Sequence, residues 1–337
     1  MSEVLTEVSR GPIVESVHYG DAVVTDSSGK IFFSIGNPGK LTYIRSAGKP
    51  LQALNVFLSG AMGKFNFSDA ELAIMCASHY GEHFHTDTVE GILRKLGLNL
   101  TDLHCGSTLS IQPDFAKEQL MNRVQLQPYN NDCSGKHTGM LAACLAKSYP
   151  IEGYTEENHP VQKDILNIVA AVCGLEPSEI PLGIDGCSVP VHGLPLKNMA
   201  MAYARLANPE NLPSEMMAPA EAILRAMNAH PEMVAGTGGF CTELIRAGHG
   251  KLIGKLGAEG IYCVGLRGRN LGLAIKIADG NYSRALNPAV LRCLEDLDAL
   301  NREEMAELET FRTGLVRNGL GMLVGEVKPV FHLRKYE

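Results

Sequence analysis

The chain has 337 residues, a formal net charge of −7 and 45% hydrophobic residues, which is enough to bury a substantial core in one large domain or two ordinary ones. An acidic balance without a basic cluster argues against nucleic acid or an anionic membrane as the main partner, so we expect a small-molecule substrate.

The first twenty residues are polar and acidic and lack the basic start and apolar core of a signal peptide. No apolar run approaches the roughly 18 residues needed to cross a bilayer. Nine cysteines without an export signal are typical of thiols, core residues or metal ligands rather than of a disulfide framework. We therefore expect a cytoplasmic protein.

The predicted elements begin with a β-hairpin over residues 12–35, whose turn is the segment D-S-S-G-K at 26–30. The middle of the chain has mostly helical periodicity, with amphipathic segments near 50–59, 86–96, 136–147, 160–173, 195–206 and 216–228. Short apolar runs between glycine-containing turns then predict strands at 251–256, 261–266 and 271–277. Helices near 286–300 and 302–310 and a last strand within 323–333 complete the order.

This order predicts an α/β (α+β) fold in which a central antiparallel sheet is built from both chain ends and a helical subdomain is inserted between them. We expect a single catalytic domain over 1–337, with a sheet subdomain at about 10–45 and 240–337 and a helical subdomain at about 46–239. A site is expected in the cleft between sheet and helices.

The segment S-A-G-K places Ser46 and Lys49 three residues apart at a predicted helix start. Residues at i and i+3 share a helical face, so the amine can reach the hydroxyl. Serine becomes a strong nucleophile when a base takes its proton, and a lysine whose pKa is lowered can be that base. The alternative is a capping serine followed by a solvated lysine.

Two further positions offer the same functional groups. Ser78, in C-A-S-H-Y-G-E-H, is either a second reactive serine or the N-cap of the helix that follows. Lys255 ends a predicted strand before a tight turn, where it either points into a cleft or faces solvent. The histidines near Ser78 are weak metal-ligand candidates, because Gly81 interrupts the spacing that one helical face requires.

The most specific local signal is N-N-D-C-S-G-K-H at 130–137, followed some fifty residues later by D-G-C-S at 185–188. Two thiolates and one nitrogen donor form a plausible zinc set, made by Cys133 and Cys187 with Lys136 or His137. Lys136 can be a ligand only as the neutral amine, and His137 is the conventional nitrogen alternative. Ordinary buried cysteines are the competing interpretation.

These motifs together resemble the rhizobial-type (class 3) L-asparaginases. The segments that carry the resemblance, in this order, are R-S-A-G-K-P-L-Q, S-H-Y-G-E, N-N-D-C-S-G-K-H-T-G-M, G-I-D-G-C-S-V-P and K-L-G-A-E-G. The similarity spans roughly residues 10–330. That family is related in fold to the serine β-lactamases and the β-lactamase-like glutaminases, so the resemblance implies their sheet-and-helix architecture.

The resemblance also implies roles for individual residues. Ser46 with Lys49 would form one Ser-Lys pair, and Ser78 with Lys255 a second. A zinc ion would be held by Cys133, Lys136 and Cys187, and would position substrate or hold the cysteine loops. His137, Asp185 and Arg45 would be supporting residues. Leu256 stands where β-lactamases often have a threonine, which makes penicillin-type chemistry a poorer expectation.

The resulting hypothesis is an amidohydrolase that converts L-asparagine to L-aspartate and ammonia through a β-aspartyl acyl-enzyme, with Ser46 favoured as nucleophile. Arg45 and Asp185 are candidates for the substrate's α-carboxylate and α-amine. A glutaminase or other small-amide hydrolase is an alternative on the same fold. A non-catalytic zinc or thiol sensor protein is the alternative from another class. The family suggests a homodimer.

Overall fold

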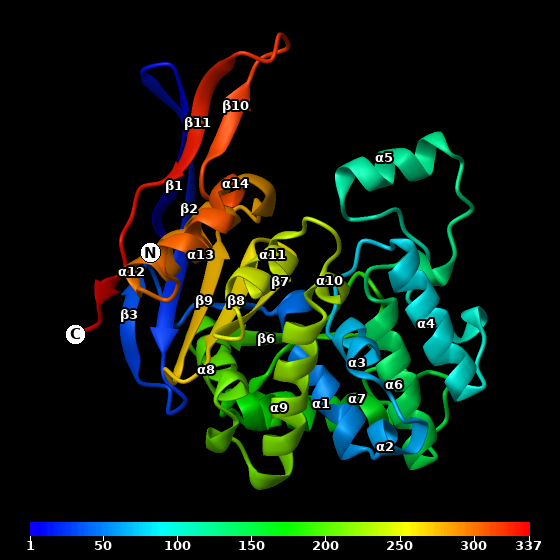
Figure 1. Cartoon of the computed structure of the whole chain (residues 1–337). Helices are drawn as coiled ribbons and strands as arrows, with labels where there is room; N and C mark the ends of the chain where they lie inside the picture. The colour runs from blue at the N-terminus through cyan, green and yellow to red at the C-terminus, as the bar shows by residue number, and fades with distance from the viewer. The chain divides into compact units, whose positions relative to one another are not determined.

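In the computed structural model, which describes residues 1–337, the chain divides into two units (Figure 1). The first unit comprises Met1–Ala47, Leu194–Asn208 and Glu243–Glu337. The second comprises Gly48–Gly193 and Pro209–Thr242. Residues 194–208, which the sequence places in the helical part, instead belong to the first unit. None of the helices combines the length and the apolar character that crossing a bilayer requires.

The first unit contains most of the strands. Its elements are β1 (Glu3–Arg10), β2 (Ile13–Thr25), β3 (Ile31–Ile35), β4 (Leu41–Tyr43), the short 3₁₀ helix η1 (Arg45–Gly48), α8 (Leu196–Ala207), β7 (Leu252–Gly257), β8 (Ile261–Leu266), β9 (Leu271–Ile277), the π-helical turn η6 (Tyr282–Leu286), α12 (Asn287–Asp296), α13 (Arg302–Glu307), α14 (Glu309–Arg312), β10 (Gly314–Arg317), β11 (Leu323–Pro329) and β12 (Arg334–Lys335). The boundaries between the units fall within η1, within β6 (Pro190–Pro195), after α8 and within α11 (Phe240–Ala247).

All of these strands except β4 form one antiparallel sheet in the order β10-β11-β1-β2-β9-β8-β7, with β3 paired to both β2 and β12; β4 belongs to a separate three-stranded sheet. The 13-residue β2 joins the two ends of the chain, because Gly20–Thr25 pair with residues 272–277 of β9. The predicted sheet from both chain ends and the predicted hairpin are confirmed. The sequence does not predict β1, whose polar start includes the buried Thr6.

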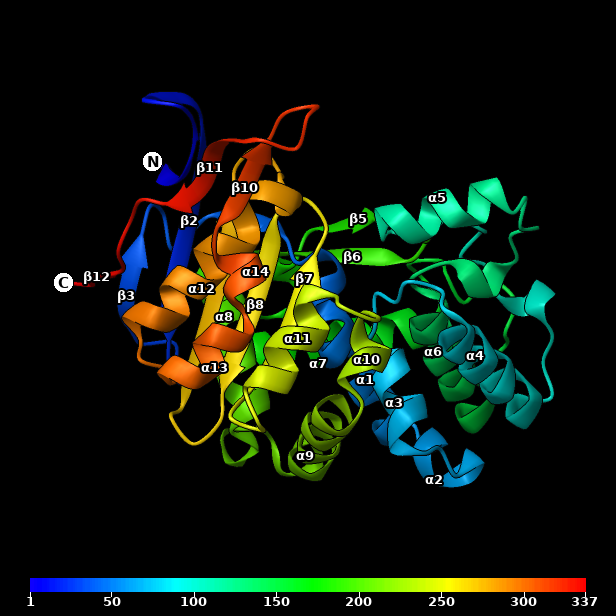
Figure 2. The same cartoon turned by 45° about the horizontal axis from the view of Figure 1, so that its top comes forward.

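Helix α8 packs on one face of this sheet, over β2, β8 and β9. Figure 2 shows α12 and α13 in front of the sheet and α8 behind it. Strands β8 and β9 are covered on both faces and are buried almost throughout, which explains their continuous apolar sequences. Burying apolar surface in this way stabilises the fold by about 25 cal/mol for each Å² removed from water.

The second unit is mainly helical. Its elements are α1 (Lys49–Leu58), α2 (Ala61–Phe65), α3 (Asp69–Met75), α4 (His83–Leu96), η2 (Leu100–Asp102), α5 (Pro113–Met121), η3 (Pro128–Asn130), α6 (Ser134–Lys147), α7 (Pro160–Cys173), η4 (Pro177–Glu179), β5 (Leu182–Ile184), β6 (Pro190–Pro195), η5 (Pro209–Asn211), α9 (Ser214–Ala229) and α10 (Pro231–Val234). All six predicted helices of the middle of the chain are confirmed, counting α8, which lies in the first unit.

Local sequence explains where these helices begin. Pro50 lies in the first turn of α1, where its missing N–H costs nothing. Ser68 and Glu71 form a reciprocal capping box at the start of α3. Helix α6 starts within the C-S-G-K-H motif, and its first eleven residues are all buried. The polar groups of that motif therefore face protein on every side and must find partners there.

Candidate functional site

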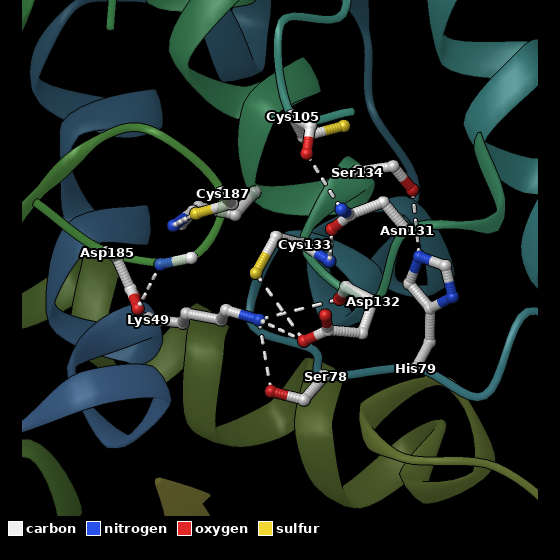
Figure 3. Close-up of polar contacts among 12 residues, drawn as sticks. Lys49, Ser78, His79, Cys105, Asn131, Asp132, Cys133, Ser134, Asp185 and Cys187 are labelled. Atoms are coloured by element: carbon white, nitrogen blue, oxygen red, sulfur yellow. Dashed lines mark hydrogen bonds and ion pairs between the residues drawn. The ribbon is translucent and has the colours of Figure 1, made fainter. Parts of the chain in front are cut away.

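Lys49, the first residue of α1, is buried and hydrogen-bonded to a serine. Its Nζ donates to Ser78 Oγ at 3.0 Å and lies 3.3 Å from Asp132 Oδ2 (Figure 3). The Asp132 carbonyl accepts a longer hydrogen bond at 3.4 Å. Ser78 follows α3 and is fixed by its backbone N–H, which donates to Val234 O at 3.0 Å. The second unit therefore holds a buried lysine–serine pair with a carboxylate beside it.

The loop before α6 positions Asp132 and Cys133. Asn131 Oδ1 accepts from the Cys133 N–H at 2.9 Å, and Asn131 Nδ2 donates to Cys105 O at 2.8 Å. The Cys133 thiol lies 3.4 Å from Asp132 Oδ2. Figure 3 shows the Cys133 sulfur and the Lys49 amine both directed toward one oxygen of the Asp132 carboxylate. Asp132 therefore links the lysine–serine pair to the cysteine loop.

Cys187 reaches this loop from the β5–β6 hairpin. Asp185 N donates to Val189 O and Ser188 N to Asp185 O, each at 2.9 Å, and Ser188 has a φ of +73°. This tight turn presents the Cys187 sulfur to the amine of Lys136, whose Nζ lies 2.9 Å away. Asp185 Oδ1 accepts from the Gly186 N–H in the same turn. The two motifs that the sequence singles out are thus in direct contact.

The charges of the cluster depend on one another. Burial alone would lower the pKa of Lys49, but its Coulombic interactions with Cys133 and Asp132 raise that pKa above its usual value. Burial would raise the pKa of Asp132, yet the Lys49 ammonium outweighs this and lowers it. Lys49 and Asp132 therefore form an ion pair in the metal-free protein.

The sulfur atoms behave as an unequal pair. A hydrogen bond from the Cys133 thiol lowers the pKa of Cys187, and the Lys136 ammonium lowers it further against the effect of burial. The same hydrogen bond, with burial, raises the pKa of Cys133. Burial would lower the pKa of Lys136, but Cys187 and Cys133 raise it. Cys187 is therefore the thiolate of the cluster, and Lys136 is its ammonium partner.

Cys133, Lys136 and Cys187 offer donors that suit a zinc ion. No three His, Cys, Asp or Glu side chains of the chain converge on a metal position, so the third donor here would be an amine. A tetrahedral zinc site places a nitrogen and a sulfur ligand about 3.5 Å apart. The observed 2.9 Å between Lys136 Nζ and Cys187 Sγ would open by roughly half an ångström, and Lys136 would lose a proton.

The histidines near Ser78 have other partners. His79 Nδ1 accepts from the Gly81 N–H at 3.1 Å, and its Nε2 contacts Ser134 Oγ at 2.8 Å. His85 Nδ1 accepts from the Glu82 N–H, and its Nε2 lies 3.0 Å from Glu232 O. Both ring nitrogens of His79 and of His85 are therefore engaged in hydrogen bonds within the protein. Burial lowers the pKa of both.

The first unit holds the other predicted residues. Arg45 and Ser46 lie in η1, and Ser46 is partly exposed. Lys255, in β7, is fully buried, and its Nζ donates to Leu256 O at 2.9 Å. A Cβ on Gly257 would lie 2.7 Å from Ile44 O, so the end of β7 lies against the residue before Arg45. Glycine is the residue that this close backbone approach permits.

The serine that contacts Lys49 within the second unit is not the predicted one. The sequence predicts Lys49 opposite Ser46, but Lys49 opens α1 after the 3₁₀ helix η1, and the serine that accepts from its amine is Ser78. Asp132 and Tyr154, a partner of His137, were not among the predicted site residues. Asp132 lies directly before C-S-G-K-H, within the segment N-N-D-C-S-G-K-H, and could have been found there, whereas no local pattern marks Tyr154.

A buried serine held by a lysine, next to a thiol–amine cluster, has the functional groups of a hydrolase site. The family model for L-asparaginase II matches residues 6–329. The chain therefore belongs to the L-asparaginase II family.

A solved structure described as Mglu in its native form in the presence of 4.3 M NaCl is similar to this chain, with 13% identity and a TM-score of 0.46. The match covers 83% of this chain and 61% of the length of that one. A search of curated proteins finds no significant match.

Proposed function

We propose that this protein hydrolyses L-asparagine to L-aspartate and ammonia. The observation that carries the proposal is the buried hydrogen bond of 3.0 Å between Lys49 Nζ and Ser78 Oγ, in a chain of the L-asparaginase II family. A serine oxygen attacks the side-chain amide carbon, and the carbon–nitrogen bond breaks as the nitrogen is protonated. Ammonia leaves, and water then hydrolyses the β-aspartyl ester.

Ser46 and Ser78 have different parts in this proposal. Ser46 is the proposed nucleophile on the strength of its S-x-x-K motif, and the residue is partly exposed. Ser78 is 4% exposed and accepts a hydrogen bond from Lys49. A hydroxyl both donates and accepts, so Ser78 is suited to pass a proton to or from the amine.

Lys49 must be neutral before it can accept a proton. Asp132 and the cysteine sulfurs instead favour its charged form in the metal-free protein. We propose zinc at Cys133, Lys136 and Cys187, where it would hold the two cysteine loops together and, by opposing the thiolate charge, favour the neutral amine.

The remaining roles stay predictions: Arg45 and Asp185 for the charged ends of the substrate, and Lys255 as a second amine for proton transfer. The cytoplasmic location is likewise a prediction.

A homodimer is also proposed. Exposed apolar side chains on β10, β11 and their connection support it, namely Leu315, Leu320, Met322 and Leu323. Light scattering of the purified protein tests this proposal, and a monomer at micromolar concentration would contradict it.

Ammonia release from purified protein tests the activity. We expect turnover of L-asparagine well above that of L-glutamine, and loss of turnover after treatment with a chelator that restoring zinc reverses. Faster release from glutamine would identify the alternative amidohydrolase. Metal binding without release from either amide would identify the sensor protein and overturn the proposal.

Alanine at each serine separates their roles. We expect Ser46→Ala to lower kcat by roughly 10³-fold or more and Ser78→Ala by roughly 10²-fold. Ser59→Ala, which removes a hydroxyl bonded to Val56 O at the end of α1, is the matched control and should keep normal turnover. Mass spectrometry of quenched enzyme should find the aspartyl adduct on the Ser46 peptide. Normal turnover of Ser46→Ala would transfer the nucleophile to Ser78.

A further inference from the structure

Asn55, on α1, is a buried residue whose side-chain carboxamide finds no hydrogen-bond partner in the protein. The residue is 2% exposed, and its Oδ1 and Nδ2 are both buried without a hydrogen bond. A carboxamide has an acceptor oxygen and two donor hydrogens, and burying such groups unpaired is costly. Buried polar groups are therefore almost always paired, either with protein or with a bound water molecule. The Asn55 side chain thus requires a polar partner from outside the chain.

A small cavity within the second unit is lined by Asn55. It lies between α1, α3, α6 and α7, and its walls include the buried apolar side chains of Val56, Met75 and Ile165. The space open to the centre of a water-sized sphere is about 10 Å³. A single water molecule requires roughly 10–15 Å³ by the same measure. The cavity therefore has the size for one water molecule and for no larger ligand.

Lys136, on α6, is a second buried polar residue in the wall of this cavity. It is 4% exposed, and its Nζ lies 2.9 Å from Cys187 Sγ. A lysine amine has at least two hydrogens, whether it is charged or neutral, so at least one is left for another acceptor. A bound water needs two to four polar partners. The Asn55 carboxamide and the Lys136 amine supply them from opposite helices, since α1 packs against α6.

We propose that this cavity is the binding site of one structural water molecule, which donates to the Asn55 carboxamide oxygen and accepts from the Lys136 amine. Asn55 is then a positioning residue that holds the Lys136 amine against Cys187 through the water. The bridge connects α1, which begins with Lys49, to the helix that carries Lys136. Its value for a zinc site rests on the proposed function, whereas the water and its two partners belong to the metal-free protein.

A high-resolution crystal structure of the metal-free protein tests the site directly. We expect density for one water molecule within hydrogen-bond distance of both the Asn55 carboxamide and Lys136 Nζ. The partly exposed Gln52 lines the same cavity and lies three residues before Asn55 on α1. A cavity without density, or a Gln52 carboxamide bonded directly to Asn55 in place of a water, overturns the proposal.

Asn55→Leu tests the positioning role, because leucine keeps the branched shape and removes the polar atoms. In its crystal structure we expect the water to be lost and the Lys136 amine to leave its 2.9 Å contact with Cys187 Sγ or to take a second conformer. Asn228→Leu is the matched control on α9 of the same unit, where Asn228 Nδ2 donates to Leu224 O at 2.9 Å. It should keep the water and the contact. An unmoved Lys136 after loss of the water overturns the positioning role.

Thermal unfolding supplies a second readout, because the sign of its change depends on the water. If the water pairs the Asn55 carboxamide, Asn55→Leu removes satisfied hydrogen bonds, and we expect Tm to fall by roughly 2–4 °C. If the cavity is dry, leucine removes unpaired polar groups and Tm rises, which would overturn the proposal. Because neither the structures nor the melting curves use asparagine or zinc, failure of the proposed activity cannot be mistaken for failure of this inference.

Discussion

The two units are packed by different forces. In the first, α8 lies on β8 and β9 through small apolar side chains and backbone, so that a Cβ on Gly272 would lie 1.9 Å from Ala200 O. In the second, the cluster around Lys49 is held by hydrogen bonds among polar groups that are buried. Apolar packing tolerates no added volume, whereas the polar cluster depends on charge and on hydrogen-bond direction.

Gly272→Ala should disrupt the apolar packing of the first unit, and it has the largest expected effect on stability. The added methyl group meets the Ala200 and Ala204 backbone, which cannot rotate away. We expect a loss of roughly 3 kcal/mol in the free energy of unfolding, measured by urea denaturation. Gly319→Ala, in the β10–β11 connection, meets nothing within 4 Å and should change it by less than about 0.5 kcal/mol. Equal stability of both variants would contradict the close packing of α8.

Asp132→Asn tests the hydrogen-bonded polar packing of the second unit. The Asp132 carboxylate is among the groups that raise the pKa of Lys49, so removing its charge lowers that pKa. If Lys49 is the base, its neutral form becomes available at lower pH. The acid limb of the kcat/KM profile should then move to lower pH by about one unit, as measured by ammonia release.

The control for this variant is Asp164→Asn, which removes a carboxylate bonded to the more exposed Lys147 at 2.8 Å. The pH profile of kcat/KM for Asp164→Asn should coincide with that of the wild type. An unchanged limb in Asp132→Asn would show that Lys49 is not the group whose titration limits the rate.

Arg225→Ala should have the smallest effect, because it removes a surface ion pair. Arg225 donates to both carboxylate oxygens of Asp69, at 3.0 and 2.9 Å, and this lowers the pKa of Asp69. A lowered pKa contributes stability above the unfolded value of about 3.9, and the contribution is lost as pH falls through the folded pKa. We expect a loss of about 0.5 kcal/mol at pH 7 that shrinks below about pH 4.

Urea midpoints at pH 7 and at about pH 3.5 measure this difference. Arg94→Ala, whose guanidinium lies 3.8 Å from Glu90 on an exposed helix face, should cost less. A deficit in Arg225→Ala that does not change with pH would mean that lost packing, and not charge, accounts for it.

The sequence predicts the packing of the first unit better than the site of the second. Periodicity identified α8, β8 and β9 because each has to bury a continuous apolar surface. It missed β1, since Thr6 is buried without being apolar. It placed α8 in the helical part, because the pattern shows which face of a helix is apolar but not which surface covers it.

The site was predicted as a set of residues rather than as a set of contacts. The motifs drew attention to four residues that the structure brings together as the pairs Lys49–Ser78 and Lys136–Cys187. Which serine meets Lys49 depends on how α1, α3 and the loop before α6 pack, and no spacing along the chain records that. Tyr154 was out of reach for the same reason, because its partner His137 lies 17 positions earlier.

Pairing between β2 and β9 also sets the order in which a nascent chain can mature. Thr25 faces Gly272, so β2 cannot pair with β9 until nearly 250 further residues have been synthesised. At 5–20 residues per second this delay is about 12–50 seconds. The segment Gly48–Gly193 emerges during that interval with most of its own core. The apolar half of β2 stays uncovered meanwhile, which makes it the part of the newly made chain that a chaperone would be expected to protect.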